Sequence, residues 1–114
     1  MLRKIFNLLD FQFGEVSISK EVSAKEAKGR IGYYDQNTGI INICRENVKS
    51  NKELVHVCLH EYAHFLQHLE EENCFRNWRT ECEFYGYENH PLEVAAEQFA
   101  ELWFFKYKEV FDGQ

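Results

Sequence analysis

The sequence has little of what linkers and low-complexity segments need. It contains one proline, Pro91, and six glycines in 114 residues, and it has no internal repeat. Hydrophobic residues make up 45% of the chain and aromatic residues 16%, which is enough to fill a packed core and argues against disorder. Because the length suits one domain, residues 1–114 are predicted to form a single domain.

Long apolar runs and an excess of basic residues are both missing. No stretch approaches the roughly 18 apolar residues of a membrane span. The apolar N-terminal stretch is interrupted at Asn7 and ends at Asp10, so it is shorter than a secretory signal requires. The net charge is −6, whereas general nucleic-acid binders carry a basic patch. We therefore expect a cytoplasmic protein that binds neither membranes nor nucleic acid.

The four cysteines, Cys44, Cys58, Cys74 and Cys82, include no Cys-x-x-Cys pair. Without a secretory signal, a disulfide framework is not expected. Cys58 lies within a predicted helix and is expected to be a small buried apolar residue. A Cys74–Cys82 bridge, or a second metal site at these residues, stays open as an alternative.

Hydrophobic periodicity predicts an α+β fold. Helices are expected over residues 2–9, from a capping box at Ser50 and Glu53 to about residue 69, and from Pro91 to about residue 110. Strands are expected over 15–19, half-buried at Val16 and Ile18, and over 31–34 and 40–44, which flank a turn and predict a β-hairpin. Residues 22–28 and the aromatic-rich 74–88 are expected to be loops, the second with a short helix as an option.

The central helix carries the strongest chemical signal. Residues 60–64 read His-Glu-Tyr-Ala-His, an HExxH motif. Residues four apart share one face of a helix, so His60 and His64 can hold one metal ion at about 2.0–2.1 Å. Glu61 can reach a water molecule on that metal and act as general base. Two ordinary surface histidines would give the same motif, but its place in a strongly apolar helix favours a metal site.

A catalytic zinc ion needs a third protein ligand, and the same helix does not supply one. His68 cannot converge with both other histidines from one straight helix and is expected to face solvent. Glu70 is rejected, because Gln67 stands where a glycine would have to break the helix.

The last helix offers Glu93 and Glu97, which lie four residues apart on one face. Ala95 and Ala96 between them are small enough to let another helix come close. One carboxylate can ligate the metal, and the other can hold a ligating histidine by its far ring nitrogen. A solvated face made of Glu93, Glu97 and Glu101 is the alternative without a metal.

Two segments, Leu-His-Glu-Tyr-Ala-His at 59–64 and Glu-Val-Ala-Ala-Glu-Gln-Phe-Ala at 93–100, resemble the paired motifs of the ImmA/IrrE-like family of gluzincin zinc metallopeptidases. The resemblance covers about residues 31–105. It implies a zincin-like domain with a short sheet packed on the HExxH helix, and zinc held by His60, His64 and Glu93. It also implies Glu61 as catalytic base and Glu97 as partner of a ligating histidine. The family has Asn or Asp at the position of Glu97, so either Glu93 or Glu97 remains possible as third ligand.

The chain is therefore predicted to be a zinc metallopeptidase that cleaves a peptide or protein, and the resemblance suggests a regulator as substrate. The expected hairpin would offer an edge strand to that peptide. Tyr85, Tyr87 and His90 are candidates for stabilising the oxyanion. The aromatic stretch 75–87 is expected to form a wall or core, or a lid. Two alternatives stay open: a non-proteolytic, zinc-stabilised binding or regulatory protein, and an acidic interaction protein without a metal.

Overall fold

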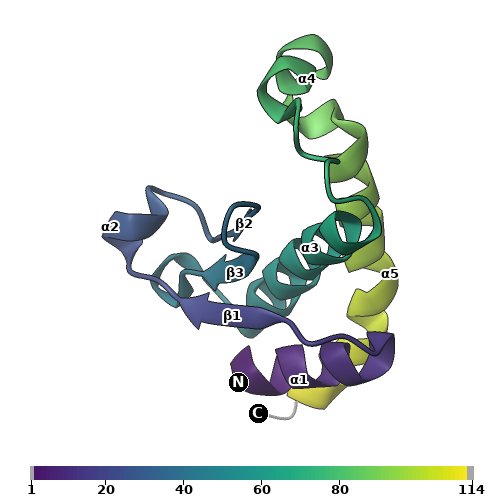
Figure 1. Cartoon of the computed structure of the whole chain (residues 1–114). Coiled ribbons are helices and arrows are strands. Elements are labelled where there is room, and N and C mark those ends of the chain that lie inside the picture. The colour runs from purple at the N-terminus through teal and green to yellow at the C-terminus, as the bar shows by residue number, and fades with distance from the viewer. Residues whose placement is uncertain (1, 113–114) are drawn as a thin grey trace.

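The protein has an α+β fold built on one central helix, as a computed structural model shows for residues 2–112, with the side chains of 109–112 left out (Figure 1). In chain order the elements are α1 (Leu2–Phe13), β1 (Ile18–Glu21), α2 (Ala24–Ala27), β2 (Gly32–Asp35), β3 (Ile40–Ile43), η1 (Arg45–Asn47), α3 (Asn51–Glu70), α4 (Trp78–Tyr85), η2 (Tyr87–Asn89) and α5 (Pro91–Asp112). Helix α3 runs through the middle, with the sheet on one side and α5 on the other.

The sheet has three strands in the order β1-β3-β2. Strand β1 pairs with β3 in parallel, and β2 pairs with β3 in antiparallel orientation. The predicted hairpin is confirmed: the Asp35 side chain accepts a hydrogen bond from the Asn37 amide at 2.9 Å, and Gly39 adopts a φ of +74° in the turn. This arrangement leaves β2 at one edge of the sheet.

Helix α3 begins at the predicted cap. The Ser50 hydroxyl accepts a hydrogen bond from the Glu53 amide at 3.1 Å, while the Glu53 carboxylate accepts one from the Lys49 amide, one residue earlier than an ideal capping box. Half of the helix is buried, which fits its position between the sheet, α1 and α5. The main core surrounds it and includes Ile5, Phe6, Leu9, Ile41, Ile43, Leu54, Val55, Cys58, Leu59, Tyr62 and Ala100. Leu69, predicted to lie on its apolar side, is 53% exposed in the last turn of the helix.

Gly32 allows β2 to lie directly on α3. A Cβ atom at this position would be 2.8 Å from Cγ2 of Val57, closer than carbon atoms pack, and 3.2 Å from the Asn42 carbonyl oxygen. A side chain here would therefore push the strand away from the helix. The edge strand and the HExxH helix are close neighbours because this residue has no side chain.

The prediction of a half-buried strand over residues 15–19 is wrong. The strand begins at Ile18 and all four of its residues are exposed, while Val16 before it is 88% exposed. The reason is its place in the sheet: β1 lies outside β3, whereas α3 packs against β2 and β3. Neither face of β1 is covered, so the alternation of apolar residues does not correspond to burial.

Two other local predictions also need correction. Residues 22–28 form more than a loop, because Ser23 caps one helical turn, α2, by accepting a hydrogen bond from the Glu26 amide at 3.2 Å. Val22 and Ala27 are buried there with Cys44. The first helix extends to Phe13, four residues beyond the predicted end.

Tertiary packing explains this longer first helix. The ring of Phe13 packs against Tyr62 of α3 and Trp103 of α5, with centroids 5.9 and 5.1 Å apart. Gly14, at a φ of +70°, then ends the helix.

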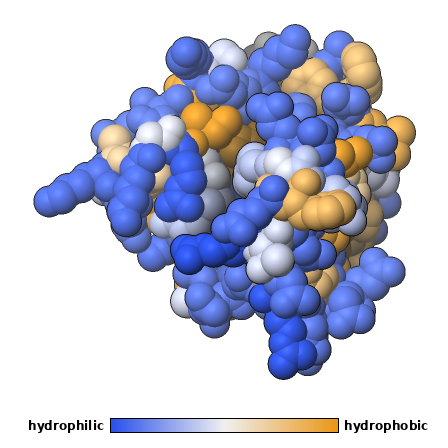
Figure 2. All heavy atoms as spheres, turned by 90° about the horizontal axis from the view of Figure 1, so that it is seen from above, coloured by the Kyte–Doolittle hydropathy of each residue, from blue (hydrophilic) through white to orange (hydrophobic). Residues whose placement is uncertain are grey.

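The four cysteines are free thiols, so the Cys74–Cys82 bridge that the sequence left open is absent, and Cys58 is fully buried as predicted. Within residues 2–112, none of the helices combines the length and apolar character that a membrane crossing requires. Seen from above, the surface is mainly hydrophilic, and its hydrophobic atoms form separate groups (Figure 2).

Candidate metal centre

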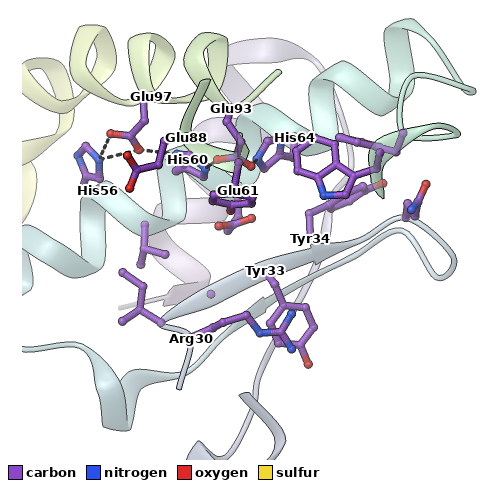
Figure 3. A pocket seen from close by; sticks show the side chains of 17 residues that line it. Arg30, Tyr33, Tyr34, His56, His60, Glu61, His64, Glu88, Glu93 and Glu97 are labelled. Atoms are coloured by element: carbon purple, nitrogen blue, oxygen red, sulfur yellow. Dashed lines mark hydrogen bonds and ion pairs between the residues drawn. The ribbon is translucent and has the colours of Figure 1, made fainter. Parts of the chain in front are cut away.

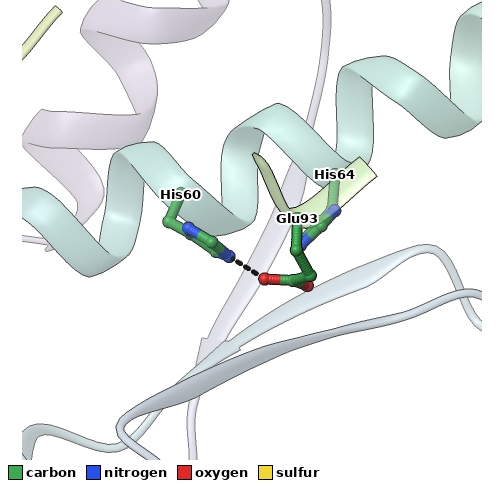
Figure 4. A group of neighbouring side chains, drawn as sticks. All are labelled: His60, His64 and Glu93. Atoms are coloured by element: carbon green, nitrogen blue, oxygen red, sulfur yellow. Dashed lines mark hydrogen bonds and ion pairs between the residues drawn. The ribbon is translucent and has the colours of Figure 1, made fainter. Parts of the chain in front are cut away.

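Three predicted ligands meet where α3 faces the start of α5 (Figure 4). The Glu93 carboxylate lies 2.9 Å from Nε2 of His60 through one oxygen and 2.8 Å from Nε2 of His64 through the other. One ligand atom from each residue lies within 4.8 Å of the other two. The side chains are 12%, 7% and 8% exposed for His60, His64 and Glu93, so this is a polar group in a largely buried place.

The start of α5 is built to bring Glu93 to this point. His90 caps the helix, because its Nδ1 accepts a hydrogen bond from the Leu92 amide at 3.1 Å. Ala96 is fully buried, which allows α5 to lie close to α3. Ala95, predicted to help in this approach, is exposed instead, because α5 turns it away from α3. Glu93 therefore reaches both histidines from the first turn of α5.

Each histidine is held at its other ring nitrogen by a second side chain. Nδ1 of His60 lies 2.5 Å from Glu97, and Nδ1 of His64 donates to the side-chain oxygen of Gln67 at 2.8 Å. Hydrogen bonds at Nδ1 orient the rings and leave Nε2 for a metal, as in known zinc sites. The two carboxylates therefore occupy different positions. Glu93 faces the Nε2 atoms of both histidines, whereas Glu97 contacts Nδ1 of His60 on the other side of that ring.

Gln67 was not predicted as part of the site. It follows His64 by three residues on the same face of α3, so helical spacing could have indicated it. Its side-chain nitrogen also donates to the Leu92 carbonyl at 2.9 Å, which ties α3 to the first turn of α5.

The charges of this group depend on one another. Burial lowers the pKa of His60, but its hydrogen bond to Glu93 and the charges of Glu61, Glu93 and Glu97 outweigh burial and raise it to about 9. Burial raises the pKa of Glu93, but the hydrogen bonds from His60 and His64 outweigh it and lower the value to about 2. Without a metal, protonated imidazole compensates the buried carboxylate.

The donor set fits a zinc ion. Two imidazole nitrogens and one carboxylate are the ligands of many catalytic zinc sites, which leave a fourth position open. The Nδ1 atom of each ring contacts Glu97 or Gln67, and the Nε2 atoms of both rings face the Glu93 carboxylate. Among the described residues, His60, His64 and Glu93 are the histidine, cysteine or acidic side chains that lie close enough together, in a group of three or more, to hold a metal ion.

Glu61, the predicted general base, lies beside this group on the side that faces β2 (Figure 3). It is only 7% exposed, and its carboxylate accepts a hydrogen bond from the Tyr34 amide. Burial raises the pKa of Glu61, while the imidazoles of His64 and His60 partly offset the rise. A carboxylate with a raised pKa is a stronger base than one in water.

An open cleft of about 890 Å³ runs past these residues, between β2 on one side and α3 with the start of α5 on the other (Figure 3). Tyr34, Phe75, Trp78 and Tyr87 line it and are called the aromatic wall below. The ring of Trp78 packs against His64 and Phe75, with centroids 6.2 and 5.5 Å away. The stretch 75–87, which includes helix α4, thus supplies one wall of the cleft.

Strand β2 borders the cleft with its free edge. The Cys44 amide donates to the Ile31 carbonyl at 2.9 Å, which makes these two residues a hydrogen-bonded pair. Because such pairs alternate in an antiparallel ladder, Tyr33 also bonds to β3, while Gly32 and Tyr34 turn their backbone groups outward. The Tyr34 amide bonds to Glu61, and the remaining groups at this edge are open to a ligand in the cleft.

The three candidates for oxyanion stabilisation occupy different places. Tyr87 lines the cleft and hydrogen-bonds to Glu93; burial, followed by the charges of Glu93 and Glu61, raises the pKa of its phenol. His90 is 2% exposed and stacks on Trp78 with centroids 4.2 Å apart. Tyr85 is 44% exposed and does not line the cleft. Only Tyr87 of the three reaches the candidate metal centre.

His68 does not face solvent as predicted. Its Nδ1 lies 2.6 Å from the Tyr34 hydroxyl, and its ring is half-buried against Phe75. The reason is β2, which crosses this part of α3 and places Tyr34 above the histidine. Glu70, rejected as a ligand, is exposed at the end of α3.

If this group holds zinc, the Glu93→Ala variant should lose it, because the Glu93 carboxylate faces both histidines. The Glu97→Ala variant should retain zinc with an affinity about 10–100-fold lower, since Glu97 acts only through His60. The double variant His60→Ala/His64→Ala should hold none. Metal analysis after dialysis and competition with a chelator measure these changes, with Glu101→Ala, an exposed glutamate of α5, as control. Loss of zinc in Glu97→Ala but not in Glu93→Ala would reverse the two roles.

Zinc binding at pH 7 is expected to release a proton from His60. The pKa of His60 is about 9 in the metal-free protein, so a proton competes with the metal below that pH. The apparent affinity should rise by about tenfold per pH unit from pH 7 to 9 and then level off. Calorimetry in two buffers of different ionisation enthalpy counts the protons. An affinity that does not change over this range would mean that His60 is already neutral.

The chain was compared with protein-family models, curated proteins and solved structures, and none of them matches it.

Proposed function

We propose that this chain is a zinc-dependent metallopeptidase with a small zincin-like fold. The observation that carries the proposal is the meeting of His60, His64 and Glu93 from two helices, with Glu61 beside them and an open cleft in front. Each part has its own use in peptide hydrolysis: a ligand set, a base, and a strand edge that can bind an extended peptide.

The side chains His60, His64 and Glu93 would hold the ion. When bound, zinc lowers the pKa of a water molecule to about 7 and polarises a carbonyl group. Glu61 would take a proton from the attacking water while the water oxygen bonds to the scissile carbonyl carbon. The same carboxyl group would then pass this proton to the amide nitrogen as the carbon–nitrogen bond breaks, which leaves an amine and a carboxylic acid, and the acid then loses its remaining proton.

The edge of β2 would hold the substrate. A peptide in the cleft can add as an extra strand to the outward backbone groups of Gly32 and to the Tyr34 carbonyl, since the Tyr34 amide is bonded to Glu61. Strand addition brings main-chain carbonyls past Glu61, which is tied to the Tyr34 amide. Side chains on the far side of the peptide would contact the aromatic wall, so large apolar residues suit that position.

Tyr87 would donate a hydrogen bond to the carbonyl oxygen as negative charge develops on it. A tyrosine phenol is protonated at neutral pH, and the raised pKa of Tyr87 keeps it so at higher pH, so it is a donor. In the absence of substrate this donor is bonded to Glu93.

The Glu61→Gln variant is expected to retain zinc and to lose peptidase activity. Glutamine has nearly the same shape but cannot accept the proton, so kcat should fall by about 10²–10⁴-fold. Digestion of a peptide library, followed by mass spectrometry, would first identify a substrate for the kinetics. Cleavage by Glu61→Gln at the wild-type rate would sink the mechanism. Zinc binding without any cleavage by the wild type would instead support the zinc-stabilised binding protein.

The pair Tyr87→Phe and Tyr85→Phe tests the oxyanion donor. Each variant removes one hydroxyl from the same short stretch, but of these two residues only Tyr87 lines the cleft. We expect kcat to fall by about 10²–10³-fold in Tyr87→Phe, with zinc content unchanged, and to stay constant in Tyr85→Phe. Equal kcat values in both variants would exclude Tyr87 from the chemistry.

A further inference from the structure

A third histidine, His56, belongs to the same polar network. It precedes His60 by one helical turn on the same face of α3 (Figure 3). Its Nε2 lies 3.2 Å from each oxygen of the Glu97 carboxylate, so the ring N–H donates to this group. One oxygen of the same carboxylate is 2.5 Å from Nδ1 of His60. Glu97 therefore lies between two imidazoles, one of which is a candidate metal ligand.

The other histidine ligand is supported in the same way. Gln67 holds Nδ1 of His64, and is itself anchored by the hydrogen bond that it donates to the Leu92 carbonyl. Both side chains that orient a ligating histidine thus have a second partner. The second partner of Gln67 is the Leu92 carbonyl oxygen, and that of Glu97 is the ring of His56.

Glu97 needs such an anchor more than Gln67 does. Its side chain is 49% exposed, and a long half-exposed carboxylate has many conformations that do not reach His60. A hydrogen bond from His56 to both oxygens restricts it to the conformation that does. His56 is itself 36% exposed, so the pair contributes little to folding and its effect falls on the geometry of His60.

We propose that His56 is a positioning residue for the metal centre, which holds Glu97 so that Glu97 orients the His60 ring toward zinc. The role rests on the zinc site proposed above. His56 lies outside the ligand set and acts only through Glu97.

The test compares zinc affinities, measured by competition with a chromophoric chelator, for the wild type, His56→Leu and His56→Gln. Leucine removes the N–H donor, so His56→Leu should bind zinc about threefold to tenfold more weakly. This effect is smaller than for Glu97→Ala, because His56 contacts the partner of a ligand and not the ligand itself. Glutamine keeps a donor and should restore the affinity to within about twofold. His68→Leu, the histidine one turn beyond the ligand pair, is the matched control and should bind zinc as the wild type does.

Two further measurements separate positioning from a general structural effect. The absorption spectrum of the cobalt-substituted protein should change in His56→Leu and return to the wild-type form in His56→Gln, because it reports the ligand geometry. The double variant His56→Leu/Glu97→Ala should bind zinc no more weakly than Glu97→Ala alone, since both substitutions remove the same support.

The outcomes distinguish this role from the proposed function. If the wild type binds zinc and His56→Leu binds it equally well, the positioning role is wrong and the metal centre stands. If His56→Leu weakens binding further in the Glu97→Ala background, His56 does not act through Glu97, and the role is again wrong. If the wild type binds no zinc, the proposed function itself fails.

Discussion

The rest of the site depends on the pairing of the buried Glu93 carboxylate with two imidazoles. Glu93 lies between α5 and α3, and each of its oxygens contacts one histidine ring. A buried charge is costly unless it is paired and hydrogen-bonded, and His60 and His64 supply both needs from one face of α3. The first turn of α5 must therefore stay against the middle of α3. The His90 cap and the fully buried Ala96 make this close contact possible.

This constraint also explains the shape of the cleft. Because Glu93 holds α5 on one side of α3, the opposite side remains for the hairpin, and Gly32 lets β2 come close to the helix. The free edge of β2 then lies next to Glu61, whose carboxylate is bonded to the Tyr34 amide. The packing of α5 and the hairpin on one helix therefore places a buried carboxylate next to a free strand edge.

Much of the local structure could be predicted because it depends on short-range patterns. The capping box predicted the start of α3, the turn before Ile40 predicted the hairpin, and helical spacing put Glu93 and Glu97 on one face. Predictions failed where burial depended on distant partners. The alternation around Val16 and Ile18 looks like a half-buried strand, but no element covers β1. His68 was expected in solvent, but β2 places Tyr34 over it.

The sequence by itself determined which residues can hold a metal: two histidines one turn apart on a helix, and a carboxylate pair on another. These depend on helical periodicity, which a few neighbouring residues encode. Only the tertiary structure decided that Glu93 faces both Nε2 atoms while Glu97 lies behind His60, and that Gln67 and His56 belong to the network. Tyr87, rather than Tyr85 or His90, reaches the cleft for the same reason. Distances between α3, α5 and β2 follow from how the core packs, and local patterns do not contain that information.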